Sequence, residues 1–374
     1  MKNSCTIFLI LVASVGFAQS DKLETLKSSN KDWLVSPFEQ KATITKEGQN
    51  IILNNGLVKR TFVIAPNVAC FDYTNLTNGQ QLIRSVEPEA KVVIDQITYK
   101  VGGLSGQKEK AYLQIDGIKN LQKADSDFVF SKYTIGKIEP FIKWKPTTWI
   151  GNAKQPTGAR IEFEYISPIA ALKNIIIKVH YELYDGIPLI TKWISIQNNS
   201  TKTVKINRVV NEVLGLVEEE SAVVGKPEEM KKQHGIYVET NYAFNNAMRY
   251  DISDQTTHWK VDLAYTSQVN YNYETPCLLE IYPEKAPGID LAPNEYFKSV
   301  RTNELLMDSY DRQRRGLMIK KMYRTLAPWT TQNPIFMHLV SQNDIDLRWV
   351  TYQDTFWSLL GSYSCLVNSF NNTL

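Results

Sequence analysis

The stretch that decides the fold is Arg160-Ile161-Glu162-Phe163-Glu164-Tyr165, in which charged and apolar residues alternate strictly. Successive side chains of a β-strand point to opposite faces, so this period of two predicts a half-buried strand. The next run repeats the pattern, with one face made of Ile175, Ile177, Val179, Tyr181 and Leu183. Two neighbouring strands with one apolar face each indicate a sheet that packs against a second layer.

Turn signals follow these strands at short intervals. Asp185-Gly186 separates the second run from residues 187–196, and Asn198-Asn199-Ser200 separates those from residues 203–210. Asp, Asn and Gly favour the tight turns that join neighbouring antiparallel strands. The sequence therefore predicts an antiparallel meander of three strands here.

Turn-forming residues also separate apolar runs nearer the N-terminus. Asn54-Asn55-Gly56 stands between two apolar runs that begin at Ile51, and Asp95-Gln96 stands between residues 92–94 and 97–101. Gly102-Gly103 reads as a bend between strands, because no phosphate-binding Lys or Ser/Thr follows it. Since no segment of residues 50–300 has a sustained helical period, we expect a large antiparallel β-sandwich that begins at Asn50.

One helix is predicted near the end of the chain. Ser309 or Asp308 can cap a segment that runs to Leu326 and stops at Ala327-Pro328. Its apolar residues recur at helical spacing and its polar face is basic, which is typical of a solvated helix face. Residues 334–339 then read as one short buried strand.

The N-terminus carries an export signal. Lys2 precedes an apolar run, and Gly16-Phe17-Ala18 places small residues before a cut at Gln19. The run is shorter than the roughly 20 residues that a membrane-spanning helix needs. We expect residues 1–18 to be a cleaved signal peptide and the protein to be exported to the periplasm or the cell exterior, without a membrane span.

Composition excludes several functions. The net charge of +3 comes from charges mixed along the chain, which gives no basic footprint for nucleic acid. After cleavage three cysteines remain (Cys70, Cys277 and Cys365) without a CxxC pair, and the four histidines lack metal-ligand spacing. We expect no metal and no cofactor, and no nucleotide-binding or hydrolase motif is present.

Aromatic residues give the best hint of a ligand. Trp144, Lys145 and Trp149 fall in a polar loop flanked by Pro and Gly. A Trp ring can stack on the apolar face of a sugar while Lys bonds its hydroxyls, so these three residues are the candidate carbohydrate contacts. The alternative is that the two rings pack against the sheet or a neighbouring domain.

An alternative to sugar binding is acid–base catalysis by residues of the strand that contains His180. Glu182 lies two residues further on and points the same way, so the pair could act as base and acid of a mutarotase-like epimerase. Such a pair more often decorates a sheet face, and this remains the weaker reading.

Six short segments, in this order, form a recognisable set: Asn54-Asn55-Gly56-Leu57-Val58-Lys59-Arg60-Thr61-Phe62, Ser85-Val86-Glu87-Pro88-Glu89-Ala90, Tyr184-Asp185-Gly186-Ile187-Pro188-Leu189-Ile190 with Lys192-Trp193, Asp311-Arg312 through Gly316, Met322-Tyr323-Arg324 with Leu326-Ala327-Pro328, and Asn333-Pro334-Ile335-Phe336-Met337-His338. Together they resemble the N-terminal β-domain of α-galactosidase-like glycoside hydrolases (family thirty-six and relatives). The resemblance covers roughly residues 50–340.

The resemblance implies a mainly β fold, an antiparallel β-supersandwich of the galactose-mutarotase-like kind, followed by a linker helix and a (β/α)₈ catalytic barrel. The expected organisation is a signal peptide (1–18), a leader (19–49), the supersandwich (50–305), the linker helix (306–328), and the start of a barrel with an atypical tail (329–374). The family's two catalytic aspartates belong to the barrel, so no catalytic residue carries over to this chain. A barrel takes about 200 residues or more, and we therefore expect a truncated protein.

The function implied is that of a non-catalytic, carbohydrate-associated domain, inactive alone, whose partners are an oligosaccharide or glycan and the family's barrel. The alternative is a stand-alone carbohydrate-binding module. Residues 341–374 contain no Lys and a single Arg, Arg348, whereas the rest of the chain is Lys-rich, which would fit a shifted reading frame near Val340.

Overall fold

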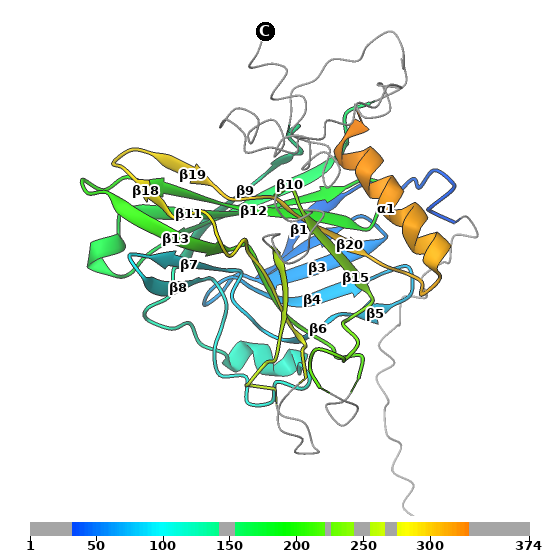
Figure 1. The fold of residues 1–374 in the computed structure, drawn as a ribbon, viewed down its shortest axis with the longest axis horizontal. Helices are drawn as coiled ribbons and strands as arrows, with labels where there is room; N and C mark the ends of the chain where they lie inside the picture. Colours follow the sequence, from blue (N-terminus) through cyan, green and yellow to red (C-terminus); the bar gives the residue numbers. More distant parts are fainter. Residues whose placement is uncertain (1–31, 142–153, 221–225, 243–254, 266–274, 329–374) are drawn as a thin grey trace, which may run out of the picture.

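A computed structural model describes residues 32–141, 154–220, 226–242, 255–265 and 275–328 (Figure 1). Strands dominate these residues, every pair of neighbouring strands is antiparallel, and the longer helix is α1 (Arg312–Leu326). Two short 3₁₀ helices span Ile115–Asn120 and Ala170–Leu172. The predicted fold class, mainly β and antiparallel, is confirmed.

Two large sheets form the sandwich. The five-stranded sheet has the order β1 (Thr43–Glu47), β2 (Asn50–Asn54), β3 (Val58–Val63), β4 (Ala69–Asn75) and β5 (Gln80–Gln81). The seven-stranded sheet has the order β15 (Ile236–Thr240), β20 (Thr302–Leu306), β12 (Leu189–Asn198), β11 (Ile175–Tyr184), β10 (Gly158–Ile166) and β9 (Val129–Lys137), with β19 (Tyr296–Lys298) paired to β12.

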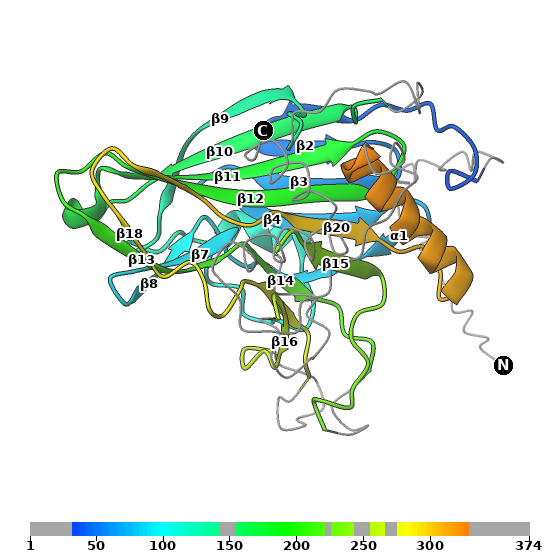
Figure 2. The same cartoon turned by 45° about the horizontal axis from the view of Figure 1, so that its top comes forward.

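Two four-stranded sheets complete the fold. The first has the order β18 (Ile289–Leu291), β13 (Val204–Val210), β7 (Ala90–Ile94) and β8 (Ile97–Val101). The second has the order β16 (Thr257–Lys260), β17 (Leu278–Ile281), β14 (Glu212–Leu216) and β6 (Ile83–Ser85). In Figure 2 the first of these small sheets lies at the left end of the sandwich, and the second lies beneath it.

The main core lies between the two large sheets. Phe62 of β3 contacts Phe163 of β10 and Tyr181 of β11, with ring centroids 5.3 and 5.1 Å apart. The half-buried strand predicted for residues 160–165 is confirmed, because Ile161, Phe163 and Tyr165 are fully buried. We call the opposite face of the seven-stranded sheet, which points away from the five-stranded sheet, the outer face.

The local turn predictions are confirmed. Gly56 follows β2 with φ +81°, and Asn54 Oδ1 accepts a hydrogen bond from its N–H. Asp95 and Gln96 join β7 to β8 with positive φ at both positions, which is the geometry of a tight hairpin turn. Gly102 and Gly103 form the expected bend, both with positive φ.

The predicted three-stranded meander is wrong at its third strand. β11 and β12 form a hairpin, but β13 pairs with β7 and β18 and not with β12. The turn at Asn198 therefore carries the chain from the seven-stranded sheet into a different sheet. The place beside β12 is taken by β19 and β20, which come about 100 residues later.

The first strand also precedes the predicted start at Asn50. β1 is an edge strand whose residues Thr43–Glu47 are mostly exposed, so its sequence lacks the apolar alternation that marks the inner strands. Upstream of it, Trp33 is buried and donates a hydrogen bond from its indole N–H to Asp308.

Helix α1 lies across one end of the seven-stranded sheet (Figure 1). Met318 and Met322 are buried in a cluster that includes Leu189 and Leu305. The cap differs from the prediction: the side chain of Asp311, and not that of Ser309 or Asp308, accepts the hydrogen bond from the N–H of Arg314.

The basic face of α1 is not fully solvated, contrary to the prediction. Arg314 makes ion pairs with Asp32 and Asp308, and Lys321 donates a hydrogen bond to the carbonyl of Trp33. Part of this face therefore binds the segment that precedes β1. Within the described ranges no helix is long and apolar enough to cross a membrane.

Candidate functional site

The outer face of the seven-stranded sheet is polar. Strand register places Glu162 of β10 opposite His180 of β11, and His180 opposite Trp193 of β12. Lys178 pairs with Ser195 in the next row, so side chains from three adjacent strands gather on one surface. The alternation that buries the apolar residues of these strands also brings their polar residues together here.

A groove of about 300 Å³ runs over this surface. Its lining residues come from β10, β11, β12 and β19: Glu162, Glu164, Ile176, Lys178, His180, Ser195, Gln197 and Tyr296. Tyr296 is 55 % exposed, so its ring is available to a ligand. The volume lies at the lower end of the range that small-molecule sites occupy, which is about 300–1,000 Å³.

A series of close polar contacts runs along the floor of the groove. Ser195 Oγ lies 2.8 Å from His180 Nε2, and His180 Nδ1 lies 3.2 Å from Glu162 Oε2. The second contact is within hydrogen-bond distance but is not aligned for a hydrogen bond in this conformation. Lys178 Nζ donates to the other carboxylate oxygen of Glu162 at 2.7 Å.

The surroundings of Glu162 and His180 set their protonation states. Contact with His180 and Lys178 outweighs burial and lowers the pKa of Glu162 to about 2, so its carboxylate is ionised at neutral pH. Burial lowers the pKa of His180 below its ordinary value of 6.5, with an opposing contribution from Glu162. The imidazole is therefore neutral at pH 7.

Trp193 holds the imidazole in place. Its ring stacks on that of His180 with an interplanar angle of 3° and a centroid distance of 4.7 Å. The guanidinium of Arg301 lies 4.1 Å from the centroid of the same indole. Trp193 is buried between these neighbours, so it orients other groups and offers no free face to a sugar.

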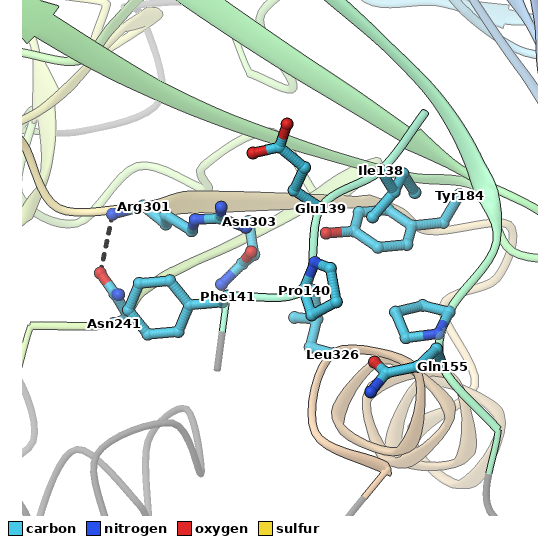
Figure 3. A pocket seen from close by; sticks show the side chains of 11 residues that line it. Ile138, Glu139, Pro140, Phe141, Gln155, Tyr184, Asn241, Arg301, Asn303 and Leu326 are labelled. Carbon is cyan, nitrogen blue, oxygen red and sulfur yellow. Dashed lines mark hydrogen bonds between the residues drawn. The ribbon is translucent and has the colours of Figure 1, made fainter. Parts of the chain in front are cut away.

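A second hollow lies nearer α1 (Figure 3). Arg301, Asn303 and Asn241 line one side, Phe141 and Leu326 border it, and Asn241 accepts a hydrogen bond from the backbone N–H of Arg301 at 2.7 Å. Its volume of about 30 Å³ is that of about one water molecule. This hollow is too small for a sugar, and the groove is the better candidate site.

A third polar cluster lies inside the sandwich and is sealed from solvent. The interior charge cluster consists of Arg60, Glu89, Lys192, Glu212 and Glu304, all buried. Arg60 donates hydrogen bonds to Glu212 at 3.0 Å and to Glu304 at 3.1 Å, and Lys192 donates one to Glu212 at 2.7 Å.

Three carboxyl groups thus face two cations. Burial raises the pKa of Glu304 well above its ordinary value, assisted by the negative charge of Glu212, whose own pKa Arg60 and Lys192 lower to about 2. Within the pair, Glu304 is therefore the member that holds a proton, and burial also raises the pKa of Glu89. The cluster is sealed between the sheets and offers no ligand site.

The sequence-predicted contacts Trp144, Lys145 and Trp149 lie outside the described residues, so their placement is untested. His180 and Glu182 do share the outer face, but they do not form the anticipated pair. Glu182 binds Arg301 and Tyr184, and the carboxylate beside His180 is Glu162. The reason is that Arg301 and Tyr184 hold the carboxylate of Glu182, whereas strand register places Glu162 directly opposite His180.

Sequence reasoning missed Ser195, Lys178 and Tyr296. The polar half of the alternation in β10 and β11 signals a polar face, but only strand register brings β12 and β19 beside it. Among the described residues no group of three or more His, Cys, Asp or Glu side chains is arranged to hold a metal ion, and Cys70 and Cys277 are buried free thiols.

No protein-family model matches this chain, and no curated protein matches it either. Among solved structures it resembles the α-galactosidase from Lactobacillus brevis (TM-score 0.41, 11 % identity), covering 74 % of this chain and 42 % of that one. It also resembles the GH36 α-galactosidase AgaA from Geobacillus stearothermophilus in complex with raffinose (TM-score 0.41, 11 % identity, 74 % and 43 % covered).

A galactose mutarotase-like protein from Clostridium acetobutylicum is matched over 72 % of this chain and 99 % of its own, at TM-score 0.33 and 11 % identity. The chain thus spans less than half the length of the α-galactosidases. At such scores and identities these likenesses do not extend to function.

Proposed function

We propose that this chain is a carbohydrate-associated β-domain of an exported α-galactosidase-like glycoside hydrolase, and that the groove on its outer face binds part of an oligosaccharide. The observation that carries the proposal is the groove itself. It combines one exposed aromatic ring, that of Tyr296, with the charged side chains of Lys178 and Glu164. An aromatic wall with a few hydrogen-bonding groups is the usual composition of a sugar site.

The ordered phrases from residue 54 to residue 338 support the assignment to this kind of hydrolase. In this proposal the domain does not cleave α-galactosides by itself, and a (β/α)₈ barrel supplies that chemistry in the intact protein. Hydrolysis of p-nitrophenyl α-galactoside by the purified chain would contradict the claim of inactivity.

Binding is tested with raffinose and stachyose, the oligosaccharides bound in two structures of the similar α-galactosidase AgaA. Calorimetry should detect binding by the wild-type chain, and Tyr296→Ala should weaken it about tenfold, since loss of one aromatic contact costs about 1 kcal/mol. Tyr112→Ala is the matched control, because Tyr112 is an exposed tyrosine outside the groove. Equal affinities of the two variants would contradict the assignment of the groove as the oligosaccharide site.

A stand-alone carbohydrate-binding module is the second candidate. Its support is the sequence around Trp144, Lys145 and Trp149, which offers two aromatic rings and a basic side chain to a sugar. In that case Trp144→Ala abolishes glycan binding while the fold is retained, and Tyr296→Ala has little effect.

We also propose export through cleavage of residues 1–18. N-terminal sequencing of the mature protein from the culture medium or periplasm should begin at Gln19. A mature protein that retains residue 1 would contradict this.

A further inference from the structure

We propose that Ser195, His180 and Glu162 form a nucleophile, a base and a positioning group that hydrolyse a small acyl ester on the saccharide in the groove. The saccharide rests on the proposed function, whereas the reactivity of Ser195 does not depend on it. An ester hydrolase activity is distinct from cleavage of a glycosidic bond and needs no barrel.

The geometry is that of an activated serine. Ser195 Oγ lies 2.8 Å from His180 Nε2, within the range expected of a nucleophile and its base. On the other side of the imidazole, Nδ1 lies 3.2 Å from Glu162 Oε2. This second contact needs a small rotation of the Glu162 side chain to align, and such contacts often tighten only when the substrate is bound.

The charges of the groups agree with these roles. An ionised Glu162 facing Nδ1 favours the tautomer with the proton on Nδ1, which leaves the lone pair of Nε2 for the hydroxyl of Ser195. The parallel ring of Trp193 fixes the plane of the imidazole. All three groups border the groove, so a ligand there meets them directly.

The charged groups around His180 come from every neighbouring strand. Glu162 and Arg160 lie on β10, Lys178 lies on β11, Lys298 lies on β19, and Arg301 approaches from beyond Trp193. Arg160 and Lys298 disfavour the imidazolium, and Glu162 favours it. The net result is a neutral base at physiological pH.

The reaction balances without an oxidant or a metal. His180 Nε2 takes the hydroxyl proton as Ser195 Oγ bonds to the ester carbonyl carbon, and the oxyanion forms beside the ammonium of Lys178, the cross-strand neighbour of Ser195. The carbon–oxygen bond to the sugar then breaks, and the sugar hydroxyl leaves with the proton from His180. Water then attacks the acyl carbon as His180 takes one of its protons. The bond from that carbon to Ser195 Oγ breaks, Oγ takes the proton back from His180, and the acyl group leaves as a carboxylic acid.

Access limits the size of the acyl group. Ser195 is only 1 % exposed, at the floor of the groove. A small acyl group such as acetyl is therefore the expected substrate class.

The test uses the full chain with p-nitrophenyl acetate and with a small fluorophosphonate. Mass spectrometry should find the phosphonyl adduct on Ser195, and Ser195→Ala should abolish both the adduct and the hydrolysis. Ser131→Ala is the matched control, since Ser131 is an exposed serine of β9 in the same sheet. His180→Gln should slow hydrolysis at least about 100-fold.

Glu162→Gln gives a readout specific to a positioning group. Hydrolysis by the wild-type chain should fall at acid pH with a midpoint below 6.5, and in Glu162→Gln this midpoint should move lower, because a carboxylate that raises the pKa of His180 is lost. A merely structural Glu162 would leave the midpoint unchanged.

The outcomes separate the two proposals. The absence of an adduct on the wild-type Ser195, with equal hydrolysis by wild type and Ser195→Ala, overturns this inference even if raffinose binds. An adduct on Ser195 without binding of any glycan supports the reactive serine and contradicts the saccharide groove. Because the adduct is measured on the wild-type chain, misfolding of a variant cannot decide the question.

Discussion

Tyr323 of helix α1 donates a hydrogen bond from its hydroxyl to the carboxylate of Glu239 in β15, at 2.5 Å. The same oxygen, Oε2, accepts a second hydrogen bond from Tyr237 at 2.8 Å. Oε1 has no hydrogen-bond partner within the described part of the chain, and the residue is only 5 % exposed. Burial raises the pKa of Glu239 to about 7, so the junction between helix and sheet contains a carboxyl that resists ionisation.

The first prediction concerns the pH dependence of this junction. The pKa of Glu239 is about 7 in the folded chain and about 4.5 when unfolded, so the folded state holds the extra proton between these values. Stability from this group is therefore present below pH 4.5 and is lost as the pH rises towards 7. Glu239→Gln should stabilise the chain at pH 8 by up to about 3 kcal/mol and change little at pH 4.5. Urea unfolding at both pH values measures the difference, and an equal effect at both would refute it.

The second prediction concerns Arg60 of the interior charge cluster. Arg60→Met removes one of the two cations that face the ionised Glu212, together with a hydrogen-bond donor to Glu304, and loss of one member of a buried ion pair costs about 3–5 kcal/mol. Lys59→Met is the matched control, because Lys59 is the adjacent residue of β3 with a side chain that is 36 % exposed. Its partner Asp72 keeps hydrogen bonds from Thr61, Thr74 and Gln81, so a smaller loss of stability is expected. Similar free energies of unfolding for the two variants would show that the cluster contributes no more to stability than the Lys59–Asp72 pair.

The third prediction asks which carboxyl of the cluster carries the proton. Glu304 is protonated and already accepts a hydrogen bond from Tyr73, so Glu304→Gln replaces a neutral group by a neutral group of similar shape. Glu212 is ionised between Arg60 and Lys192, so Glu212→Gln removes a needed charge. We expect Glu212→Gln to lower the thermal midpoint clearly more than Glu304→Gln. The reverse order would place the proton on Glu212.

The fourth prediction concerns the bend after β8. Gly103 has φ +82°, and a Cβ there would lie 2.6 Å from the Cα of Pro88. Gly48 also has positive φ (+58°) but has open space around its Cβ position. Gly48→Ala should cost only the backbone strain of about 1–2 kcal/mol, whereas Gly103→Ala should cost about 1–3 kcal/mol more. Equal denaturation midpoints would mean that Pro88 moves aside freely.

Local sequence signals predict the strands and turns well, because they depend on neighbouring residues alone. The alternation in β10, the turn at Gly56 and the end of α1 at Ala327 follow from side-chain direction and backbone preference. The departure of β13 into another sheet could not be predicted in this way. Its partners β7 and β18 are far away in the sequence, and a turn at Asn198 fits a hairpin and a crossing equally well.

The candidate site was harder to predict for the same reason. Glu162 and His180 are visible as polar members of alternating strands, but their neighbour Ser195 belongs to a strand in which nearly every residue is buried. Tyr296 reaches the groove only through β19, which joins the sheet about 100 residues after β12. Trp144 and Trp149 are predicted as carbohydrate contacts from their residue type alone, and their contribution to binding remains a prediction.

The interior charge cluster also affects the order of events on the ribosome. Arg60 and Glu304 are 244 residues apart in the chain, and a ribosome that adds about 5–20 residues per second needs roughly 10 to 50 seconds to make that stretch. Until Glu304 emerges, Arg60 cannot be enclosed with its full set of hydrogen-bond partners. We therefore expect the two large sheets to stay apart and hydrated during synthesis, so that the sandwich closes late.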